Sequence, residues 1–268
     1  MEEAVLLLSD LQLGVRSVSF NSQIAKERVA TVADKVVKLT KKHRSAAKVD
    51  VLNILLLGDL IHQDYPWFAD RDEVELITID QFREVVDVAL SKNLIDKVLP
   101  HFKHINIYSV PGNHGSLGNL ASRRTNMDTM VAYNLQTLYR DNKKISWGIT
   151  DEFYQIVVIQ GKRFLLFHGD QIKSYTGGLP WYGLVNKLLR WYSTMQGAFD
   201  VAVHGHFHTI NHWHIGSIAV FSNGSFFTDD LYSLRKVGYD ATPMQWLFFV
   251  PDDKERPITA MYPVDFIP

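Results

Sequence analysis

The sequence predicts an α/β fold in which two β-sheets pack together and helices lie outside them. The early part of the chain alternates short apolar runs with longer amphipathic segments, whereas the later part consists mostly of strand-like runs. No repeat, low-complexity tract or linker interrupts this pattern, so we expect residues 1–268 to form a single domain. With 46% hydrophobic and 21% charged residues, the chain can bury a large core without disulfides.

The early part is expected to alternate strands with helices. Residues 4–8 form a continuous apolar run, which predicts a strand buried on both faces. Residues 22–43 carry apolar side chains at helical spacing between Lys and Glu, which predicts an amphipathic helix. The same two patterns predict strands over 51–57 and 105–110, and helical structure in one or two pieces over 73–99.

The later part is expected to be richer in strands. Glycines after residue 114 indicate an irregular loop, and residues 127–140 are compatible with a helix. Two apolar runs flank Gln160-Gly161-Lys162, which is a hairpin signal. An aromatic-rich helix is predicted over 180–196. The strands predicted in this part are 153–159, 163–168, 200–204, 212–215, 218–222 and 245–250, and the chain ends in extended structure.

Composition excludes several classes of protein. The chain has no cysteine, which excludes disulfides, thiolate metal sites and cysteine nucleophiles. Its net charge of -1 provides no bulk basic field, although a local basic patch is compatible with this sum. The first ten residues lack the features of a signal peptide, and no apolar run is long enough to span a membrane. We therefore expect a soluble, cytoplasmic protein; a homodimer or an accessory protein is compatible with the sequence.

Five short motifs carry potential metal ligands, and most of them directly follow a predicted strand. Carboxylates, amides and imidazoles are ligands of divalent metals, and side chains at strand ends can converge on one point. These motifs at successive strand ends therefore predict a pair of divalent metals that activates water. The motifs are SDLQLG with Asp10, LLLGDLIH with Asp59, VPGNHG with Asn113 and His114, FHGD with His168, and VHGHFH with His206 and His208.

Each motif taken alone has another interpretation. Asp10 or Asp59 could cap a helix or form a salt bridge, and the Gly-Asn-His run could be a turn with an incidental histidine. A lone histidine such as His168 is more often a satisfied core residue than a ligand.

The alternating histidines after residue 203 raise a question of orientation. His204, His206 and His208 would share one face of an extended segment, although Gly205 interrupts a regular strand. His212 and His214 continue the alternation, and we interpret these two as exposed strand positions.

The ordered set resembles the calcineurin-like metallophosphoesterase superfamily, whose pattern is D-x-H, G-D, G-N-H-[DE], H and G-H-x-H. The resemblance covers about residues 5–225. It implies a four-layer α/β/β/α sandwich of two mixed β-sheets flanked by helices. It also implies a role for each matching residue: Asp10 and His208 bind a first metal, Asp59 bridges both metals, Asn113, His168 and His206 bind a second, and His114 acts as a catalytic acid that also orients the phosphate.

Two positions depart from the family pattern. Gln12 stands where the family has histidine, and Gly115 stands where it has Asp or Glu. A Gln12 carbonyl oxygen is a weaker ligand than imidazole, which favours Mn²⁺ or Mg²⁺ over Zn²⁺ at the first site. We expect two divalent ions, with Mn²⁺ favoured and Mg²⁺, Zn²⁺, Fe or Ni²⁺ compatible. Because the missing carboxylate often supports the catalytic histidine, we expect His114 to be held differently.

The resemblance implies hydrolysis of phosphoric esters by a metal-bridging hydroxide. The G-D-L-I-H stretch and the motif spacing are most similar to the DNA repair exonuclease branch and its phage-like relatives, which implies a phosphodiesterase or nuclease acting on DNA or RNA. A small-molecule phosphatase or a lipid-nucleotide pyrophosphatase is the second interpretation. The third is a binding subunit that kept the fold and lost catalysis.

Two features bear on the substrate. Arg123 and Arg124 follow the glycine-rich loop, and they are candidates for binding a substrate phosphate; a solvated loop is an equally open interpretation. The aromatic residues of the helix over 180–196 could stack nucleic-acid bases or cover an acyl chain, but at helical spacing they are more often part of a core.

Overall fold

The computed structural model describes residues 1–64, 73–118, 121–122, 124–173, 179–195, 199–228, 242–253 and 256–266. Within these ranges no helix is both long enough and apolar enough to cross a membrane.

The first sheet contains six strands in the order β11-β10-β1-β2-β3-β4. Strands β1 to β4 run parallel, whereas β10 pairs antiparallel with β1 and β11 pairs antiparallel with β10. The sheet is therefore mixed. Its strands are β1 (Glu2–Leu8), β2 (Val49–Leu56), β3 (His104–Ser109), β4 (Ile145–Ile149), β10 (Met244–Pro251) and β11 (Ala260–Asp265).

The second sheet contains five strands in the order β5-β6-β7-β9-β8, and it is also mixed. The antiparallel pairing of β5 with β6 confirms the predicted hairpin, whose turn places Gln160 and Gly161 in the left-handed region. The strands are β5 (Tyr154–Ile159), β6 (Lys162–Phe167), β7 (Val201–His204), β8 (Asn211–Ile215) and β9 (Ile218–Ser222).

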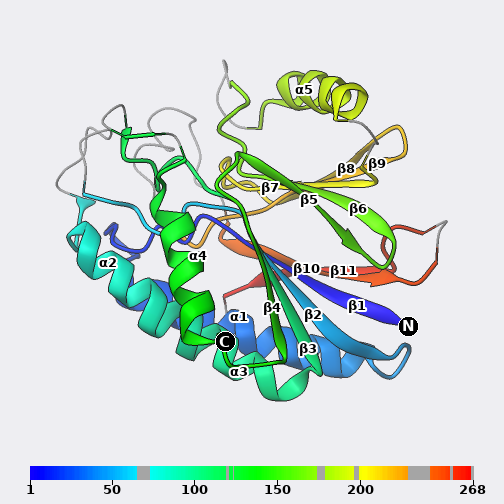
Figure 1. Ribbon diagram of the computed structural model, residues 1–268, viewed down its shortest axis with the longest axis horizontal. Coiled ribbons are helices and arrows are strands. Elements are labelled where there is room, and N and C mark those ends of the chain that lie inside the picture. The colour runs from blue at the N-terminus through cyan, green and yellow to red at the C-terminus, as the bar shows by residue number, and fades with distance from the viewer. Residues whose placement is uncertain are drawn as a thin grey trace.

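Helices cover the outer face of each sheet (Figure 1). The predicted helix α1 (Ser22–His43) begins after Asn21, whose side chain accepts a hydrogen bond from the amide of Ile24 and caps the first turn. The helical structure predicted over 73–99 is present in several joined pieces, one of them a π-helix. The other helices are α2 (Thr78–Glu84), η2 (Val85–Ile95), α3 (Asp96–Val98), η3 (Leu99–His101), α4 (Met127–Leu138) and α5 (Trp181–Thr194).

Three apolar clusters separate the four layers. One cluster joins α1, η2 and α4 to the outer face of the first sheet, and a second fills the space between the sheets. The third joins α5 to the outer face of the second sheet through Leu184 and Leu188. The layers are thus helices, sheet, sheet and helix, which confirms the predicted α/β/β/α sandwich (Figure 1).

Strand β4 was not predicted. It is five residues long, contains Gly148 and lies at the edge of the first sheet, where among the described residues it pairs with β3 alone. A short edge strand with a glycine has neither a continuous apolar run nor a clear alternation, so its pairing partner rather than its own pattern defines it.

The loops that carry the five motifs leave the same ends of the sheets. Strands β1, β2 and β3 are parallel, so their C-terminal ends lie at one edge of the first sheet. Strands β6 and β7 are parallel to each other, and their C-terminal ends deliver the histidine motifs of the second sheet. Backbone hydrogen bonds join the first two loops: the amide of Asp10 donates to Gly58 and that of Gln12 donates to Asp59.

Candidate metal centre

The backbone at the site adopts an uncommon conformation. Among the described residues, most non-glycine positions with positive φ carry a predicted ligand: Asp10 (53°), Gln12 (44°), Asp59 (54°), His206 (70°) and His208 (53°). This conformation costs about 1–3 kcal/mol at a non-glycine residue, and it persists where surrounding contacts enforce it. The native structure therefore tolerates unfavourable backbone conformations at the residues whose side chains face the candidate centre.

Gly58 shows why the second motif needs a glycine. It has a φ of +88°, and a Cβ atom built there would lie 2.5 Å from Cα of Gly112. The loops after β2 and β3 can touch only because this side chain is absent. Their contact brings Asp59 beside the loop that carries Asn113 and His114, and the amide of His114 donates to Oδ1 of Asp59 over 2.7 Å.

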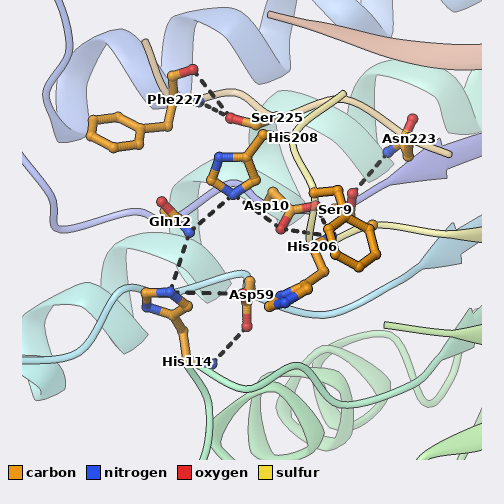
Figure 2. Close-up of polar contacts among 12 residues, drawn as sticks. Ser9, Asp10, Gln12, Asp59, His114, His206, His208, Asn223, Ser225 and Phe227 are labelled. Carbon is orange, nitrogen blue, oxygen red and sulfur yellow. Dashed lines mark hydrogen bonds and ion pairs between the residues drawn. The ribbon is translucent and has the colours of Figure 1, made fainter. Parts of the chain in front are cut away.

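Asp10 and His208 form one half of the site (Figure 2). Nε2 of His208 lies 3.4 Å from Oδ1 of Asp10, and the amide of His206 donates to both oxygens of that carboxylate. The side-chain Nε2 of Gln12 lies 3.3 Å from Nε2 of His208 and 3.4 Å from Nε2 of His114. The Gln12 amide thus lies where the family pattern has an imidazole ligand.

Asp59, His168 and His206 form the other half. One ligand atom from each lies within 4.8 Å of the others, which is compact enough to hold a divalent ion. Nε2 of His168 lies 3.0 Å from Oδ2 of Asp59 and 3.0 Å from Oδ1 of Asn113. Nδ1 of His168 lies 2.7 Å from the carbonyl oxygen of Leu57, and such a bond fixes the ring so that Nε2 faces the centre.

Charges in this half favour a cation. Burial raises the pKa of Asp59, but the surrounding histidines, His168 foremost, together outweigh burial and hold that pKa well below its usual range. Burial lowers the pKa of His168, but the nearby carboxylates, Asp59 foremost, together outweigh burial and raise it to about 10. Burial lowers the pKa of His206 to about 3, so its ring is neutral at pH 7. A positive charge beside Asp59 is therefore stabilised, and a neutral imidazole is available to bind a metal.

His114 lies between the two halves. Its Nε2 is 3.9 Å from Oδ2 of Asp59 and 3.4 Å from Nε2 of Gln12 (Figure 2). Its Nδ1 lies 3.3 Å from the carbonyl oxygen of His62. The ring is partly exposed, whereas Asp10, Asp59 and His168 are fully buried. Like His208, whose side chain is also partly exposed, His114 thus both faces a carboxylate and reaches the solvent side.

The donor set fits divalent metals. It combines buried carboxylates, a neutral amide oxygen and imidazoles, held by backbone bonds at fixed positions. Asp59, Asn113, His168 and His206 would hold one ion, and Asp10, Asp59, His208 and the Gln12 side chain would hold the other.

A family model described as calcineurin-like phosphoesterase matches residues 4–241. The chain belongs to this family. Calcineurin-like phosphoesterases are metal-dependent hydrolases of phosphoric esters, which agrees with the donor set at the strand ends. A search of curated proteins found no match.

Several solved structures are similar to this calcineurin-like phosphoesterase at low sequence identity. A predicted phosphoesterase from Streptococcus pneumoniae TIGR4 is 13% identical, with a TM-score of 0.44, over 94% of this chain and 85% of that one. Vps29 from Entamoeba histolytica complexed with Zn²⁺ is 11% identical, with a TM-score of 0.42, over 98% and 99%. A novel archaeal phosphodiesterase is 13% identical, with a TM-score of 0.42, over 97% and 99%.

The structure corrects the prediction that the alternating histidines share a face. Strand β7 ends at His204, and the positive φ angles of His206 and His208 turn the chain out of extended geometry. The buried ring of His204 points away from the centre and packs against aromatic rings, 5.2 Å from Phe167 and 6.2 Å from Trp213 between centroids.

The other two histidines of that region lie in strand β8, as predicted. His214 is exposed. His212 is half-buried rather than exposed, because its ring lies 4.4 Å from that of Phe221 between centroids. The prediction of exposure was therefore wrong for this residue.

Arg124 lies at the edge of a cleft next to the centre. The cleft has a volume of about 680 Å³, and its lining includes the predicted ligand Asn113. Nε of Arg124 lies 2.9 Å from Asp151, and Nη2 lies 2.8 Å from Glu152, so two carboxylates already bind this guanidinium. Arg123 lies outside the described residues.

The aromatic helix α5 divides its side chains between two environments. Trp191 packs on Phe167 with centroids 5.2 Å apart, as expected for a core residue. Tyr182 is 88% exposed and Trp181 is 44% exposed. The core interpretation therefore holds for part of this helix only.

Asp128 is a buried residue of the site that the sequence analysis missed. It lies in the first turn of α4, and its carboxylate accepts hydrogen bonds from the amides of Asp59, Leu60 and Gly112. Burial and the nearby Asp59 charge raise the pKa of Asp128 to about 6. Its sequence signal is only that of an acid following the helix cap Asn126, which is common in helices without any functional role.

Proposed function

We propose that this chain hydrolyses phosphodiester bonds with two divalent ions, of which Mn²⁺ fits best. The observation that carries the proposal is the convergence of Asp10 and Asp59 from one sheet with His168, His206 and His208 from the other, in hydrogen-bond or ligand distance of one another. The carbonyl oxygen of Gln12, turned toward the ion in place of the amide nitrogen that lies 3.3 Å from Nε2 of His208, would favour a hard ion at one half of the site.

Bound divalent ions would supply an activated water and positive charge beside the phosphoryl oxygens. The protein supplies the geometry. The strained backbone at Asp10 and Asp59 and the bond from His168 to Leu57 fix the ligands before substrate arrives, so little reorganisation is needed during reaction. His114 faces the same space from the exposed side, and we assign to it the transfer of a proton to the leaving oxygen.

For the substrate, we propose nucleic acid. The cleft beside Asn113 falls in the usual range of small-ligand sites, about 300–1,000 Å³, so it has room for a nucleotide. Phe153 lines this cleft and is 39% exposed, which offers an aromatic surface on which a base can stack. Arg124 at the same cleft is the candidate for contact with a phosphate.

A specific observation favours a second candidate, a small phosphodiester or pyrophosphate. The described lining of the cleft carries three carboxylates, Asp151, Glu152 and Asp170, against the single guanidinium of Arg124. A polyanion would meet repulsion there, whereas a leaving group rich in hydroxyls or carrying a cation would not. The exposed aromatic residues of α5 are compatible with the lipid-linked version of this candidate.

The test is hydrolysis of end-labelled single- and double-stranded DNA and RNA beside small diesters and nucleotide pyrophosphates, each with Mn²⁺. Cleavage of polymers that is lost in Asp59→Asn and His114→Ala supports a nuclease, and the label reports the polarity. Cleavage of small diesters alone supports the second candidate. A protein that binds Mn²⁺ and hydrolyses none of these esters contradicts the proposal and favours a binding subunit.

A further inference from the structure

The loop that carries His114 has no carboxylate of its own, yet a carboxylate is packed against it. A Cβ atom built on Gly115 would lie 2.1 Å from Oδ1 of Asn126 and 2.9 Å from Oδ2 of Asp128. Residues from the start of α4 thus occupy the space that a side chain at position 115 would need. A carboxylate at this place comes from another element of the chain.

Asp128 joins two loops of the metal centre. Its Oδ2 accepts from the amide of Asp59 over 2.9 Å and from the amide of Gly112 over 2.9 Å, and its Oδ1 accepts from the amide of Leu60 over 3.0 Å. One loop carries Asp59, and the other continues from Gly112 directly into Asn113. A single carboxylate therefore sets the separation of the two loops.

Asn126 completes the connection. Its side-chain nitrogen donates to the carbonyl oxygen of Gly112 over 2.8 Å, and its Oδ1 accepts from the amide of Asp128 over 2.8 Å. The amide of Met127 donates to the carbonyl oxygen of Gly115 over 2.7 Å. The start of α4 is thus bound to the loop on both sides of the Asn113–His114 pair, and Asp128 is held in one orientation.

These bonds act on a strained residue. Asp59 has a φ of 54°, a conformation that needs external contacts to persist. A buried carboxylate that accepts three amide hydrogens makes charge-assisted bonds, which are stronger than neutral ones. Removing the Asp128 carboxylate would leave three amides without this partner and would let the Asp59 backbone relax away from the centre.

We propose that Asp128 is a positioning residue of the metal centre, which holds the bridging ligand Asp59 and the Asn113 loop in register and replaces the carboxylate missing at position 115. The proposal rests on the metal centre of the proposed function and does not depend on which ester is hydrolysed. It predicts that Asp128 acts on metal binding without touching a metal.

The test is binding of Mn²⁺ to the metal-free full chain, measured by calorimetry and by the electron paramagnetic resonance spectrum. We expect Asp128→Ala to weaken Mn²⁺ binding about 10- to 100-fold, as for other residues that orient metal ligands. Its spectrum should lose the signature of a spin-coupled pair that we expect for the unmodified protein. Asp128→Asn keeps the side-chain volume but loses at least one hydrogen bond from a backbone amide. Its Mn²⁺ affinity should therefore lie between that of the unmodified protein and that of Asp128→Ala. If the alanine variant does not fold, Asp128→Asn provides the test.

The control separates positioning from general stability. Val131 lies in the same helix, and its apolar side chain is fully buried in the core between α4 and the first sheet. Val131→Ala should lower the melting temperature and leave Mn²⁺ affinity unchanged when measured well below that temperature.

Two outcomes would overturn the proposal: unchanged affinity and spectrum in both Asp128 variants, or an equal loss of affinity in Val131→Ala. If the Asp128 variants behave as expected but the unmodified protein hydrolyses no ester, the proposed function fails while the positioning role stands.

Discussion

Nε2 of His168 lies 3.0 Å from Oδ2 of Asp59, and this contact joins the two sheets at the metal centre. Asp59 follows β2 of the first sheet, whereas His168 follows β6 of the second. Both residues are fully buried. The site therefore exists only when the two sheets are packed together, so folding of the sandwich and assembly of the donor set are one event.

Replacing Gln12 by histidine should strengthen one half of the centre. The Gln12 side chain lies within 3.3 Å of His208, where an imidazole would offer a better ligand. We expect Gln12→His to raise affinity for the weaker ion about tenfold, or ~1.4 kcal/mol. Calorimetric titration with Mn²⁺ and Zn²⁺ measures this, and the gain should be larger for Zn²⁺. Gln12→Ala is the control, and an affinity that stays equal in all three proteins would contradict the prediction.

His114→Ala should affect the chemical step according to the leaving group. Because we assign proton transfer to His114, the loss in kcat should be about 10²–10⁴-fold for an ester with a poorly acidic leaving alcohol. An ester of p-nitrophenol needs little protonation, so its loss should be much smaller. Steady-state kinetics on both esters measures the difference, with Mn²⁺ content verified in each protein. Equal losses on the two esters would exclude the assigned role.

Metal affinity should rise with pH. In the metal-free protein burial lowers the pKa of His168, but Asp59 and the other nearby carboxylates together raise it to about 10, so a bound ion must displace a proton from this ring at neutral pH. Raising the pH towards 10 removes that competing proton, and apparent Mn²⁺ affinity should increase by up to about tenfold per pH unit. Calorimetry in buffers of different ionisation enthalpy should detect one released proton from this group. Binding without proton release between pH 6 and 9 would contradict the prediction.

Removing Arg124 should weaken the binding of a nucleic-acid substrate. Its side chain is 61% exposed and paired with Asp151 and Glu152, so we expect Arg124→Ala to change the free energy of unfolding by less than about 1 kcal/mol. Without the guanidinium the cleft is more negative. For nucleic acid the KM should therefore rise about fivefold, with kcat unchanged.

The exposed Arg140, which lies 3.6 Å from Asp141, provides the matched control as Arg140→Ala. A KM for nucleic acid that is the same in both variants would remove Arg124 from substrate binding.

The elements and the ligand motifs were readable from sequence because their signals are local. The strands that precede Asp10 and Asp59 are rich in apolar residues, and helix α1 shows clear helical spacing of its apolar residues. The order of the motifs then indicated the family and with it the four layers. The sequence was weaker where partners decide structure, as for β4, which is defined by its pairing with β3.

The features of the site that were not predicted depend on long-range contacts. The carboxylate of Asp128 bonds amides that lie 69, 68 and 16 residues away, and no local pattern encodes such bonds. His206 and His208 have positive φ angles and the amide of His206 donates to Asp10 of the first sheet, so alternation along the chain gave the wrong face for His204. Both the Asp128 hydrogen bonds and the turn after His204 depend on residues that are far apart in the sequence, so a local pattern does not indicate them.

The most direct test of the account is hydrolysis of a simple phosphodiester by the Mn²⁺-loaded protein, compared with its metal-free form and with Asp59→Asn. Asp59 contributes to both halves of the proposed centre, so its loss should remove several kcal/mol of charge stabilisation, or about a thousandfold in kcat/KM. We expect turnover by the loaded protein alone. Equal turnover by Asp59→Asn, or by the metal-free protein, would contradict it.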